Sequence, residues 1–536
     1  MNYKRLTAAA LVSTLLLSAC STGNNKKLNV INDDYRTNYE IFVYSFYDSD
    51  GDGIGDLNGI TEKLDYLNDG NDKTDTDLGV NGIWLTPICP STTYHKYDVT
   101  DYRDIDPEFG TMEDYEKLIE ECHKRGITVT FDFVMNHTSS KHPWFTEAVS
   151  YLKTLPEEAT EADIDTTACP YAGYYNFSKE NKDGYVNLEG TSWYYEARFW
   201  SEMPDTNLDN PALQKEFIDI AKFWMDKGVD SFRLDAVTSY YTGNPEKNTE
   251  ALTWFNDAVK DYNQMAYIVG EAWTNQKEYA SYYASGINSF FDFAFSGNDG
   301  VIAKTVKGQI PASSFAKALE KEEELYASYN ESYINAPFYT NHDINRSAGY
   351  YSGDYASDLV KMAGGLNLLM SGNAYIYYGD EIGMKGSGKD ENKRAPMQWS
   401  EYDTEGLCNG PADMDNIEMI YGYADNQMND PSSIRSYYRN AIRMRNIYPV
   451  IARGKTTFVK ESDTANSCIL KKSDERFDDV YIVINPTDEM DAMSLSDLSE
   501  KHLKVDYELL ANNISDHAKI KNKVLTLPPH SIIILK

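Results

Sequence analysis

The chain is poor in two features that would each point to a particular class of protein. It has 6 cysteines in 536 residues, and no two of them form a Cys-x-x-Cys pair, so a thiolate metal site has no support. Basic residues are outnumbered, because 50 Lys and Arg stand against 84 Asp and Glu and give a net charge of −34. So acidic a surface repels phosphate backbones, and we therefore expect no nucleic-acid partner.

Long apolar runs are also missing beyond the first residues. The run Leu6–Leu17 follows two basic residues; it is too short to span a bilayer but suits the apolar part of a signal peptide. It leads into Leu-Ser-Ala-Cys20, which resembles a bacterial lipobox. We therefore expect a lipoprotein signal peptide at 1–19, a lipid anchor to the membrane on Cys20 and a tether at 20–35. The protein would be exported and held at the cell surface.

The rest of the chain alternates short apolar runs with segments of helical periodicity, such as 112–125 and 211–227. Eight runs are predicted strands: Glu40–Phe46, Gly82–Pro87, Ile127–Val134, Val229–Leu234, Tyr267–Gly270, Phe290–Phe293, Ala336–Thr340 and Ala374–Tyr378. This alternation predicts an α/β fold of the (β/α)8 TIM-barrel type. A doubly wound sheet is the alternative, but no Gly-rich phosphate turn follows the first strand.

The alternation is interrupted twice. After the third predicted strand comes a Tyr-rich stretch too long for a βα loop, so we expect an inserted subdomain at 138–203. From residue 453 onward, strands follow one another with no long helix between most of them, which predicts a C-terminal antiparallel β-sandwich at 453–536. The barrel would then occupy 36–137 and 204–452.

Acidic side chains stand at the ends of three predicted strands. Asp235 ends the fourth, Glu271 ends the fifth, and Asp343 follows the seventh. The C-terminal ends of barrel strands carry the active site, and Arg233 points the same way as Asp235 because it lies two residues earlier. A single carboxylate of this kind is usually a cap or a salt bridge. Three together favour glycoside hydrolysis, where one carboxyl group attacks and another protonates the leaving oxygen.

Four short segments surround these carboxylates. They are Asp132-Phe-Val-Met-Asn-His137, Gly228-Val-Asp-Ser-Phe-Arg233-Leu-Asp235, Gly270-Glu271-Ala-Trp273 and Tyr339-Thr-Asn-His342-Asp343. In order and spacing they resemble the motifs of the α-amylase family of glycoside hydrolases, close to its oligo-1,6-glucosidase and neopullulanase-like branch. The resemblance extends over about residues 36–536.

The resemblance implies a retaining mechanism. Asp235 would form the covalent glycosyl intermediate, Glu271 would act as general acid and then base, and Asp343 would bind sugar hydroxyls and help distort the ring. Asp132 would support Arg233 from beneath. The substrate-binding residues that the resemblance implies are Tyr97, His137, Arg233 and His342.

Carboxylates also recur at alternate positions of the Gly-rich segment 48–56, directly after the first predicted strand. Such a loop can wrap a hard cation with oxygen ligands, although Gly59 stands where an EF-hand has its twelfth-position Glu. Oligosaccharide-cleaving members of the family carry a similar loop, so the resemblance implies a structural Ca²⁺. Its ligands would be the side chains of Asp48, Asp50, Asp52 and Asp56 and the carbonyl of Ile54.

The expected function is a monomeric, endo-acting hydrolase of α-1,4-glucosidic bonds in α-glucans, namely starch and maltooligosaccharides. In exo-acting relatives, the tyrosine that stacks on the glucose, Tyr97 here, is preceded three positions earlier by an acidic residue. That residue pairs with an Arg and closes the pocket behind the terminal glucose; this chain has Tyr94 at that position. The alternatives within the fold are an exo-acting α-glucosidase or oligo-1,6-glucosidase and a 4-α-glucanotransferase. From another class comes a non-catalytic starch-binding protein, but such relatives lose carboxylates that this chain keeps.

The lipobox makes a testable prediction about location. Cys20→Ser removes the thiol that acylation requires, so we expect the variant to be released into the soluble fraction while the parent protein partitions with membranes. Cell fractionation with an activity assay on each fraction measures this. Recovery of the unaltered protein cleaved beyond Cys20 and free in the medium would contradict the prediction.

Overall fold

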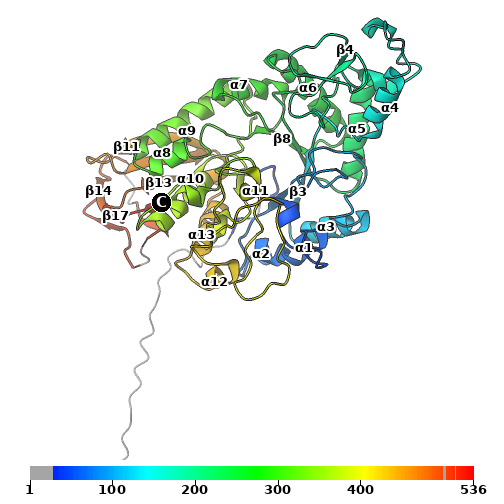
Figure 1. The fold of residues 1–536 in the computed structure, drawn as a ribbon. Helices are drawn as coiled ribbons and strands as arrows, with labels where there is room; N and C mark the ends of the chain where they lie inside the picture. The colour runs from blue at the N-terminus through cyan, green and yellow to red at the C-terminus, as the bar shows by residue number, and fades with distance from the viewer. Residues whose placement is uncertain (1–27, 30, 499–502, 513–514) are drawn as a thin grey trace, which may run out of the picture.

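The computed structural model describes residues 28–29, 31–498, 503–512 and 515–536 (Figure 1). The predicted signal peptide and Cys20 lie outside the described residues. None of the helices in the described part has both the length and the apolar character needed to cross a membrane.

A parallel sheet with the order β10-β1-β2-β3-β7-β8-β9 forms the centre of the molecule. Its strands are β1 Thr37–Ile41, β2 Gly82–Leu85, β3 Thr128–Phe133, β7 Ser231–Leu234, β8 Tyr267–Gly270, β9 Ser289–Phe290 and β10 Ala374–Tyr377. Two isolated parallel bridges, Phe291 to Ala336 and Phe338 to Tyr375, join β9 to β10 through the segment predicted as the seventh strand. The sheet thereby closes, and the predicted TIM barrel is confirmed.

The first strand was wrongly placed. The prediction was Glu40–Phe46, but the strand ends at Ile41, and Val43–Ser45 forms a 3₁₀ helix, η1. Phe42 and Phe46 are fully buried, and the Phe46 carbonyl accepts a hydrogen bond from the Trp399 indole N–H at 2.7 Å. The residues of this run are therefore apolar because the loop that carries Trp399 buries them, and not because their backbone is extended.

Helices surround the sheet, and several of them begin at a side-chain cap. α3 (Met112–Lys124) begins with a reciprocal capping box between Thr111 and Asp114, and α5 (Pro211–Asp226) begins with an Asn210 cap and Pro211 in its first turn. The remaining α-helices outside the insertion are α1 Leu57–Glu62, α2 Leu64–Leu67, α6 Pro245–Tyr262, α7 Gln276–Ser281, α8 Val301–Val306, α9 Ala312–Ala327, α10 Ala356–Leu369, α11 Asp390–Lys393, α12 Ala424–Met428, α13 Ile434–Ile447 and α14 Val450–Arg453. Short 3₁₀ helices are η4 Tyr282–Ser285, η5 Ser347–Gly349 and η6 Asp380–Ile382.

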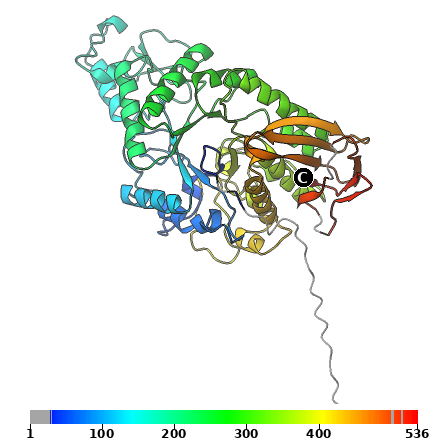
Figure 2. The same cartoon turned by 180° about the vertical axis from the view of Figure 1, so that it is seen from behind.

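The stretch between β3 and α5 has secondary structure of its own. It contains α4 (Pro143–Leu152), η2 (Glu161–Asp163), η3 (Pro170–Gly173) and a small antiparallel sheet of β4 (Phe177–Ser178), β6 (Tyr194–Glu196) and β5 (Tyr185–Asn187). It extends from one end of the barrel, away from the C-terminal domain (Figures 1 and 2).

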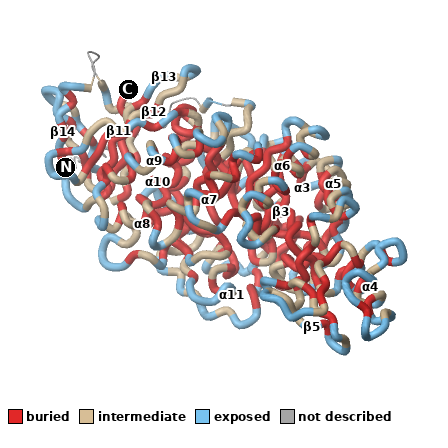
Figure 3. The backbone as a smooth tube through the Cα atoms, turned by 90° about the horizontal axis from the view of Figure 1, so that it is seen from above, coloured by how far each residue is buried: buried red, intermediate tan, exposed pale blue. Residues whose placement is uncertain are grey.

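The C-terminal region forms two antiparallel sheets. The larger has the order β11-β12-β13-β18-β15, with β11 Lys455–Glu461, β12 Cys468–Asp474, β13 Phe477–Asn485, β18 Ser531–Leu535 and β15 Val505–Leu510. The smaller consists of β14 Asp491–Ser494, β17 Val524–Leu527 and β16 Lys519–Lys521. Glu323 on α9 accepts hydrogen bonds at 2.6 Å from the Thr456 N–H and hydroxyl, which ties the barrel to β11. Buried backbone continues from the barrel into this region (Figure 3).

Candidate active site

Neighbouring strand ends bring the motif residues together. Asp132 on β3 lies directly beside Arg233 on β7, because their Cα atoms are partners in the parallel pairing. Asp235 follows β7, and Glu271 follows the adjacent strand β8. A parallel sheet thus places three carboxylates and one guanidinium at a single edge of the barrel.

The Arg233 guanidinium lies at the centre of this group. It is 1% exposed, and its Nη1 donates to Asp132 Oδ1 at 2.8 Å and to Asp235 Oδ1 at 2.6 Å. Its Nη2 lies 3.5 Å from Glu271 Oε2. Burial alone would lower the pKa of Arg233, but Asp132 and the other nearby anionic groups outweigh it and raise the pKa above its usual value. One permanent cation therefore balances several buried acidic groups.

Glu271 is held as a buried acid. Burial raises its pKa to about 8; Arg233 opposes this shift, while the charges of Asp235 and Asp343 add to it. Its Oε2 accepts a hydrogen bond from the Ala236 N–H at 2.8 Å, and Ala236 itself adopts a positive φ of 49°. Because this carboxyl group is largely protonated at neutral pH, it can donate a proton to a bound oxygen.

Asp343 and His342 form a second charged pair. His342 Nδ1 lies 2.6 Å from Glu40 Oε1, and its Nε2 lies 3.0 Å from Asp343 Oδ2. Burial favours the neutral ring, but Asp343 and Glu40 outweigh it and raise the pKa of His342 to about 9. Burial likewise disfavours the Asp343 carboxylate, yet His342, Arg394 and Arg233 hold its pKa well below the usual value. At neutral pH this pair is an imidazolium beside a carboxylate.

Tyr97 and His137 complete the set that the motifs named. The Tyr97 ring stacks on the His342 ring, with centroids 5.5 Å apart and planes 13° apart, and its hydroxyl donates to Asp132 at 3.0 Å. His137 is buried, and its Nε2 has no hydrogen-bond partner in the described part of the chain. Burial lowers the pKa of His137, so a neutral imidazole presents an unused ring nitrogen to a ligand.

Sequence reasoning missed Glu40 and did not assign Arg394 to the site. Glu40 is 1% exposed on β1 and orients His342; its signal was a charged residue inside an apolar run. Arg394 donates to Asp343 Oδ1 and to the Tyr94 hydroxyl, both at 2.8 Å. The Lys393 ammonium donates to the Asp343 carbonyl at 2.7 Å. The end of α11 and the residue that follows it therefore fix Asp343 from two sides.

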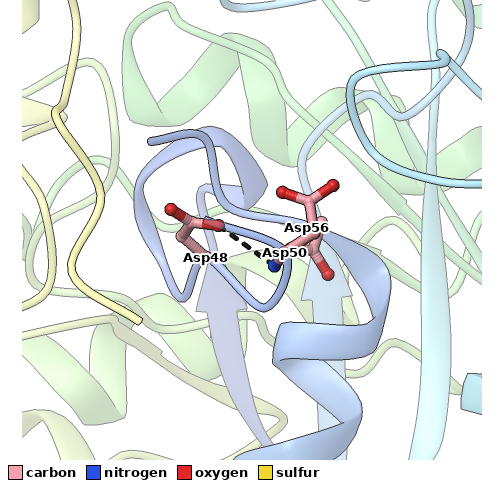
Figure 4. A group of neighbouring side chains, drawn as sticks. All are labelled: Asp48, Asp50 and Asp56. Carbon is pink, nitrogen blue, oxygen red and sulfur yellow. Dashed lines mark hydrogen bonds between the residues drawn. The ribbon is translucent and has the colours of Figure 1, made fainter. Parts of the chain in front are cut away.

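The predicted cation loop gathers three of its five expected ligands. Asp48, Asp50 and Asp56 offer carboxylate oxygens that all lie within 4.8 Å of one another (Figure 4). Asp52 is not part of this group, and its Oδ1 accepts a hydrogen bond from the Ile54 N–H at 2.7 Å. Three hard oxygen donors of like charge at this separation fit a divalent cation such as Ca²⁺.

Comparison with known proteins identifies the family. The model described as "Alpha amylase, catalytic domain" matches residues 40–454. The chain is 36% identical over 509 residues to "Alpha-amylase 3" of Dictyoglomus thermophilum, covering 93% of this chain and 92% of that protein. It is 30% identical over 512 residues to "Oligo-1,6-glucosidase" of Parageobacillus thermoglucosidasius, covering 79% and 85%.

Solved structures agree. Eubacterium rectale Amy13B superposes with a TM-score of 0.90 at 46% identity, covering 96% of this chain and 98% of that one. The alpha-amylase from H. orenii superposes with a TM-score of 0.80 at 34% identity, covering 94% and 99%. Fold and site define a barrel enzyme of the glycoside hydrolase class. The chain belongs to the α-amylase family.

The central guanidinium makes a prediction about stability. Arg233→Met removes the cation shared by Asp132, Asp235 and Glu271, so we expect the free energy of unfolding to fall by about 3–5 kcal/mol at neutral pH. Urea denaturation followed by circular dichroism measures it. Arg103→Met is the matched control, because Arg103 pairs with Glu216 at 2.7 Å on the surface and should change stability by no more than about 1 kcal/mol. Equal unfolding midpoints for the two variants would refute this account.

Proposed function

We propose that this enzyme is a retaining, endo-acting hydrolase of α-1,4-glucosidic bonds in starch and maltooligosaccharides. The observation that carries the proposal is the contrast between two neighbouring carboxyl groups. Asp235 accepts a 2.6 Å hydrogen bond from the Arg233 guanidinium, whereas burial raises the pKa of Glu271 to about 8. A charge-paired carboxylate beside a protonated carboxylic acid suits a nucleophile and a general acid.

In this mechanism Glu271 gives its proton to the glycosidic oxygen while Asp235 Oδ attacks the anomeric carbon. The bond to the leaving sugar breaks, and a covalent glycosyl ester forms on Asp235. The Glu271 carboxylate then takes a proton from water, which attacks the same carbon and releases Asp235. Asp343 and His342 bind sugar hydroxyls, and the negative charge of Asp343 favours the oxocarbenium-like transition state.

Endo-action is proposed because the pocket lacks the ion pair that closes it in exo-acting relatives. Arg394 meets the Tyr94 hydroxyl at 2.8 Å rather than a carboxylate at that position. Without a closed end, internal bonds of a long chain can lie across Asp235 and Glu271. The second candidate is an exo-acting α-glucosidase or oligo-1,6-glucosidase, which the presence of Arg394 and the 30% identity to a protein of the latter name favour. A 4-α-glucanotransferase is a further alternative.

Digestion of soluble starch distinguishes these modes. Endo-action shortens chains internally, so iodine staining should collapse early while reducing ends are still few, and mixed short maltooligosaccharides should accumulate. Chromatography of the products and staining against reducing ends give both readouts. Release of glucose alone with staining nearly intact would establish exo-action instead.

The two carboxyl groups make a separate prediction. Asp235→Asn and Glu271→Gln keep shape and hydrogen bonding, so each should lower kcat roughly 10³-fold or more with little change in melting temperature. Because the pKa of Glu271 is about 8, the parent enzyme should keep its kcat/KM through neutral pH and lose it as the acid deprotonates above about 8. Retention of a tenth of the parent activity by either variant would overturn the role assigned to that residue.

We also propose a structural Ca²⁺ at Asp48, Asp50 and Asp56, supported by the closeness of their carboxylates. When bound, the ion would neutralise like charges and join the two ends of the loop. The loop lies against the segment after residue 400, since the Asp48 N–H donates to the Gly406 carbonyl at 3.0 Å and the Asn409 N–H to the Gly53 carbonyl at 2.7 Å.

Export and membrane anchoring through Cys20 remain proposed on the strength of the lipobox.

Removal of the cation should lower stability before it affects the chemistry. Chelation is expected to lower the melting temperature by several degrees, because the three carboxylates then repel one another, and added Ca²⁺ should restore it. Differential scanning fluorimetry measures this. Asp50→Asn should weaken the response to Ca²⁺, while Asp65→Asn, outside the loop, serves as the control. An unchanged melting temperature on chelation would remove the basis for the site.

A further inference from the structure

Arg346 is a buried arginine that the mechanism above does not use. It follows Asp343 by three residues and is 0% exposed. The nearest carboxylate contact of its guanidinium is 3.8 Å long, to Asp380, and burial raises the pKa of Asp380 to about 7, so this group is only partly charged at neutral pH. A buried guanidinium is costly unless other groups compensate it. The groups that do so show what Arg346 holds together.

Two backbone carbonyls accept the hydrogen bonds of the guanidinium. Its Nη1 donates at 2.6 Å to the carbonyl of Tyr378, directly after β10, and its Nε donates at 2.9 Å to the carbonyl of Lys393, the last residue of α11. The guanidinium carbon also lies 4.3 Å from the ring centroid of Tyr377 and 4.6 Å from that of Tyr378. Because the donors form a planar, rigid fork, they fix the two carbonyls relative to each other. Arg346 thereby joins the end of β10 to the end of α11.

The segment that leads into α11 is tied to the same stretch of chain at further points. The Arg346 N–H donates to the Gly386 carbonyl at 2.9 Å, and the Gly388 N–H donates to the Asn345 side-chain oxygen at 3.2 Å. A Cβ at Gly386 would overlap the Asn392 carbonyl oxygen, so glycine is required for this close approach. The residues directly after Asp343 therefore form one packed unit with segment 386–393.

The carbonyl that Arg346 holds belongs to the peptide between Lys393 and Arg394. This carbonyl also accepts a hydrogen bond from the Tyr377 hydroxyl at 3.0 Å, so two donors fix it. The Lys393 ammonium donates to the Asp343 carbonyl at 2.7 Å, and Arg394 donates to Asp343 Oδ1 at 2.8 Å. Arg346 is thus one peptide away from both side chains that hold Asp343.

We propose that Arg346 is a positioning residue for Asp343. It fixes the peptide between Lys393 and Arg394, so that these two side chains hold the Asp343 carboxylate at the place where it binds sugar hydroxyls. This inference rests on the role proposed for Asp343. Arg346 itself is fully buried and acts only through its neighbours. A displacement of about 1 Å in a positioned group can lower the rate about 10²-fold, so the effect is measurable.

A purely structural role is the alternative, and Arg445 provides the matched comparison. Arg445 is 3% exposed, and its Nη1 donates to the carbonyls of Leu368 at 2.8 Å and Met370 at 2.6 Å. These carbonyls precede β10, whereas Tyr378 follows it, so Arg445 lies at the end of the strand opposite the active site. Arg346 and Arg445 therefore have the same kind of partners at different ends of the barrel.

Substitution by methionine removes either guanidinium and keeps an apolar stem. We expect both variants to lose stability, but only Arg346→Met to change the kinetics on maltoheptaose, followed by reducing ends at a temperature where circular dichroism shows both variants folded. Its kcat should fall about tenfold and its KM should rise about tenfold, because Asp343 is displaced from the sugar hydroxyls. Arg445→Met should keep both constants within about threefold. A loss of folded protein alone would leave KM unchanged.

A double-mutant cycle with Arg394→Met tests whether Arg346 acts through its neighbours. Once Arg394 has lost its contact with Asp343, only the Lys393 contact is left for Arg346 to position. Arg346→Met should therefore lower kcat/KM by no more than about tenfold in the Arg394→Met background, compared with about 10²-fold in the parent. An equal loss in the two backgrounds would overturn the proposal.

The remaining outcomes separate this inference from the proposed function. Asp343→Asn with full kcat/KM contradicts the role proposed for Asp343, and the positioning role falls with it. A large loss in Asp343→Asn beside an Arg346→Met variant with the kinetics of the parent overturns the positioning role alone. Should Arg346→Met fail to fold, Tyr377→Phe removes only the second donor to the Lys393 carbonyl. A kcat/KM lowered severalfold in that variant supports the proposal, and an unchanged kcat/KM overturns it.

Discussion

The active site depends on one buried cation. Arg233 is hydrogen-bonded to Asp132 and Asp235 and lies within 3.5 Å of Glu271, so three acidic groups share a single buried guanidinium. Buried charges are costly unless they are paired, and here there are fewer cations than acids. The imbalance is relieved by protonation of Glu271, whose pKa burial raises to about 8. Burial, which the single guanidinium offsets only in part, thus gives Glu271 the protonated state that the proposed general acid requires.

The carboxylates around His342 are compensated differently from those around Arg233. Glu40 and Asp343 lie on either side of His342, and together they raise the pKa of its imidazole to about 9. Arg394 adds a further cation beside Asp343. This side of the site therefore keeps its carboxylate charged, whereas Glu271 keeps its proton. The two environments differ in which group is protonated. Beside Asp343 the proton is on the His342 imidazole and the carboxylates stay charged, whereas at the other carboxyl group the proton is on Glu271 itself.

Sequence reasoning succeeded where a local pattern reflects a local cause. β8 has its predicted bounds, because it is a short apolar run, and α3 and α5 match within two residues. It failed where burial is imposed from elsewhere in the chain. The apolar run after Ile41 is buried under the loop that carries Trp399, 353 residues away from its partner Phe46, so no local signal could distinguish it from a strand.

The candidate site shows the same limit. Asp235, Glu271 and Asp343 could be found because each lies in a motif, the first two directly after β7 and β8. Glu40 contacts His342 across 302 positions, and only the closed barrel reveals that contact. In the C-terminal domain, β11 has only two apolar residues and the second half of β12 is polar, so neither strand forms an apolar run along its whole length. Whether β11 and β12 form strands therefore depends on pairing with distant segments of the chain rather than on their own composition.

The residue after Asp235 links the two carboxyl groups of the proposed mechanism through the backbone. Ala236 has a positive φ, a conformation that costs a residue with a Cβ about 1–2 kcal/mol. This turn aims its N–H at Glu271 Oε2, while the Val237 N–H donates to the Glu271 carbonyl at 3.0 Å. Two consecutive amides from the Asp235 segment therefore hold both ends of Glu271. The position of Glu271 relative to Asp235 is constrained by this strained backbone connection as well as by the neighbouring strands, and the strain is offset by the two hydrogen bonds it makes possible.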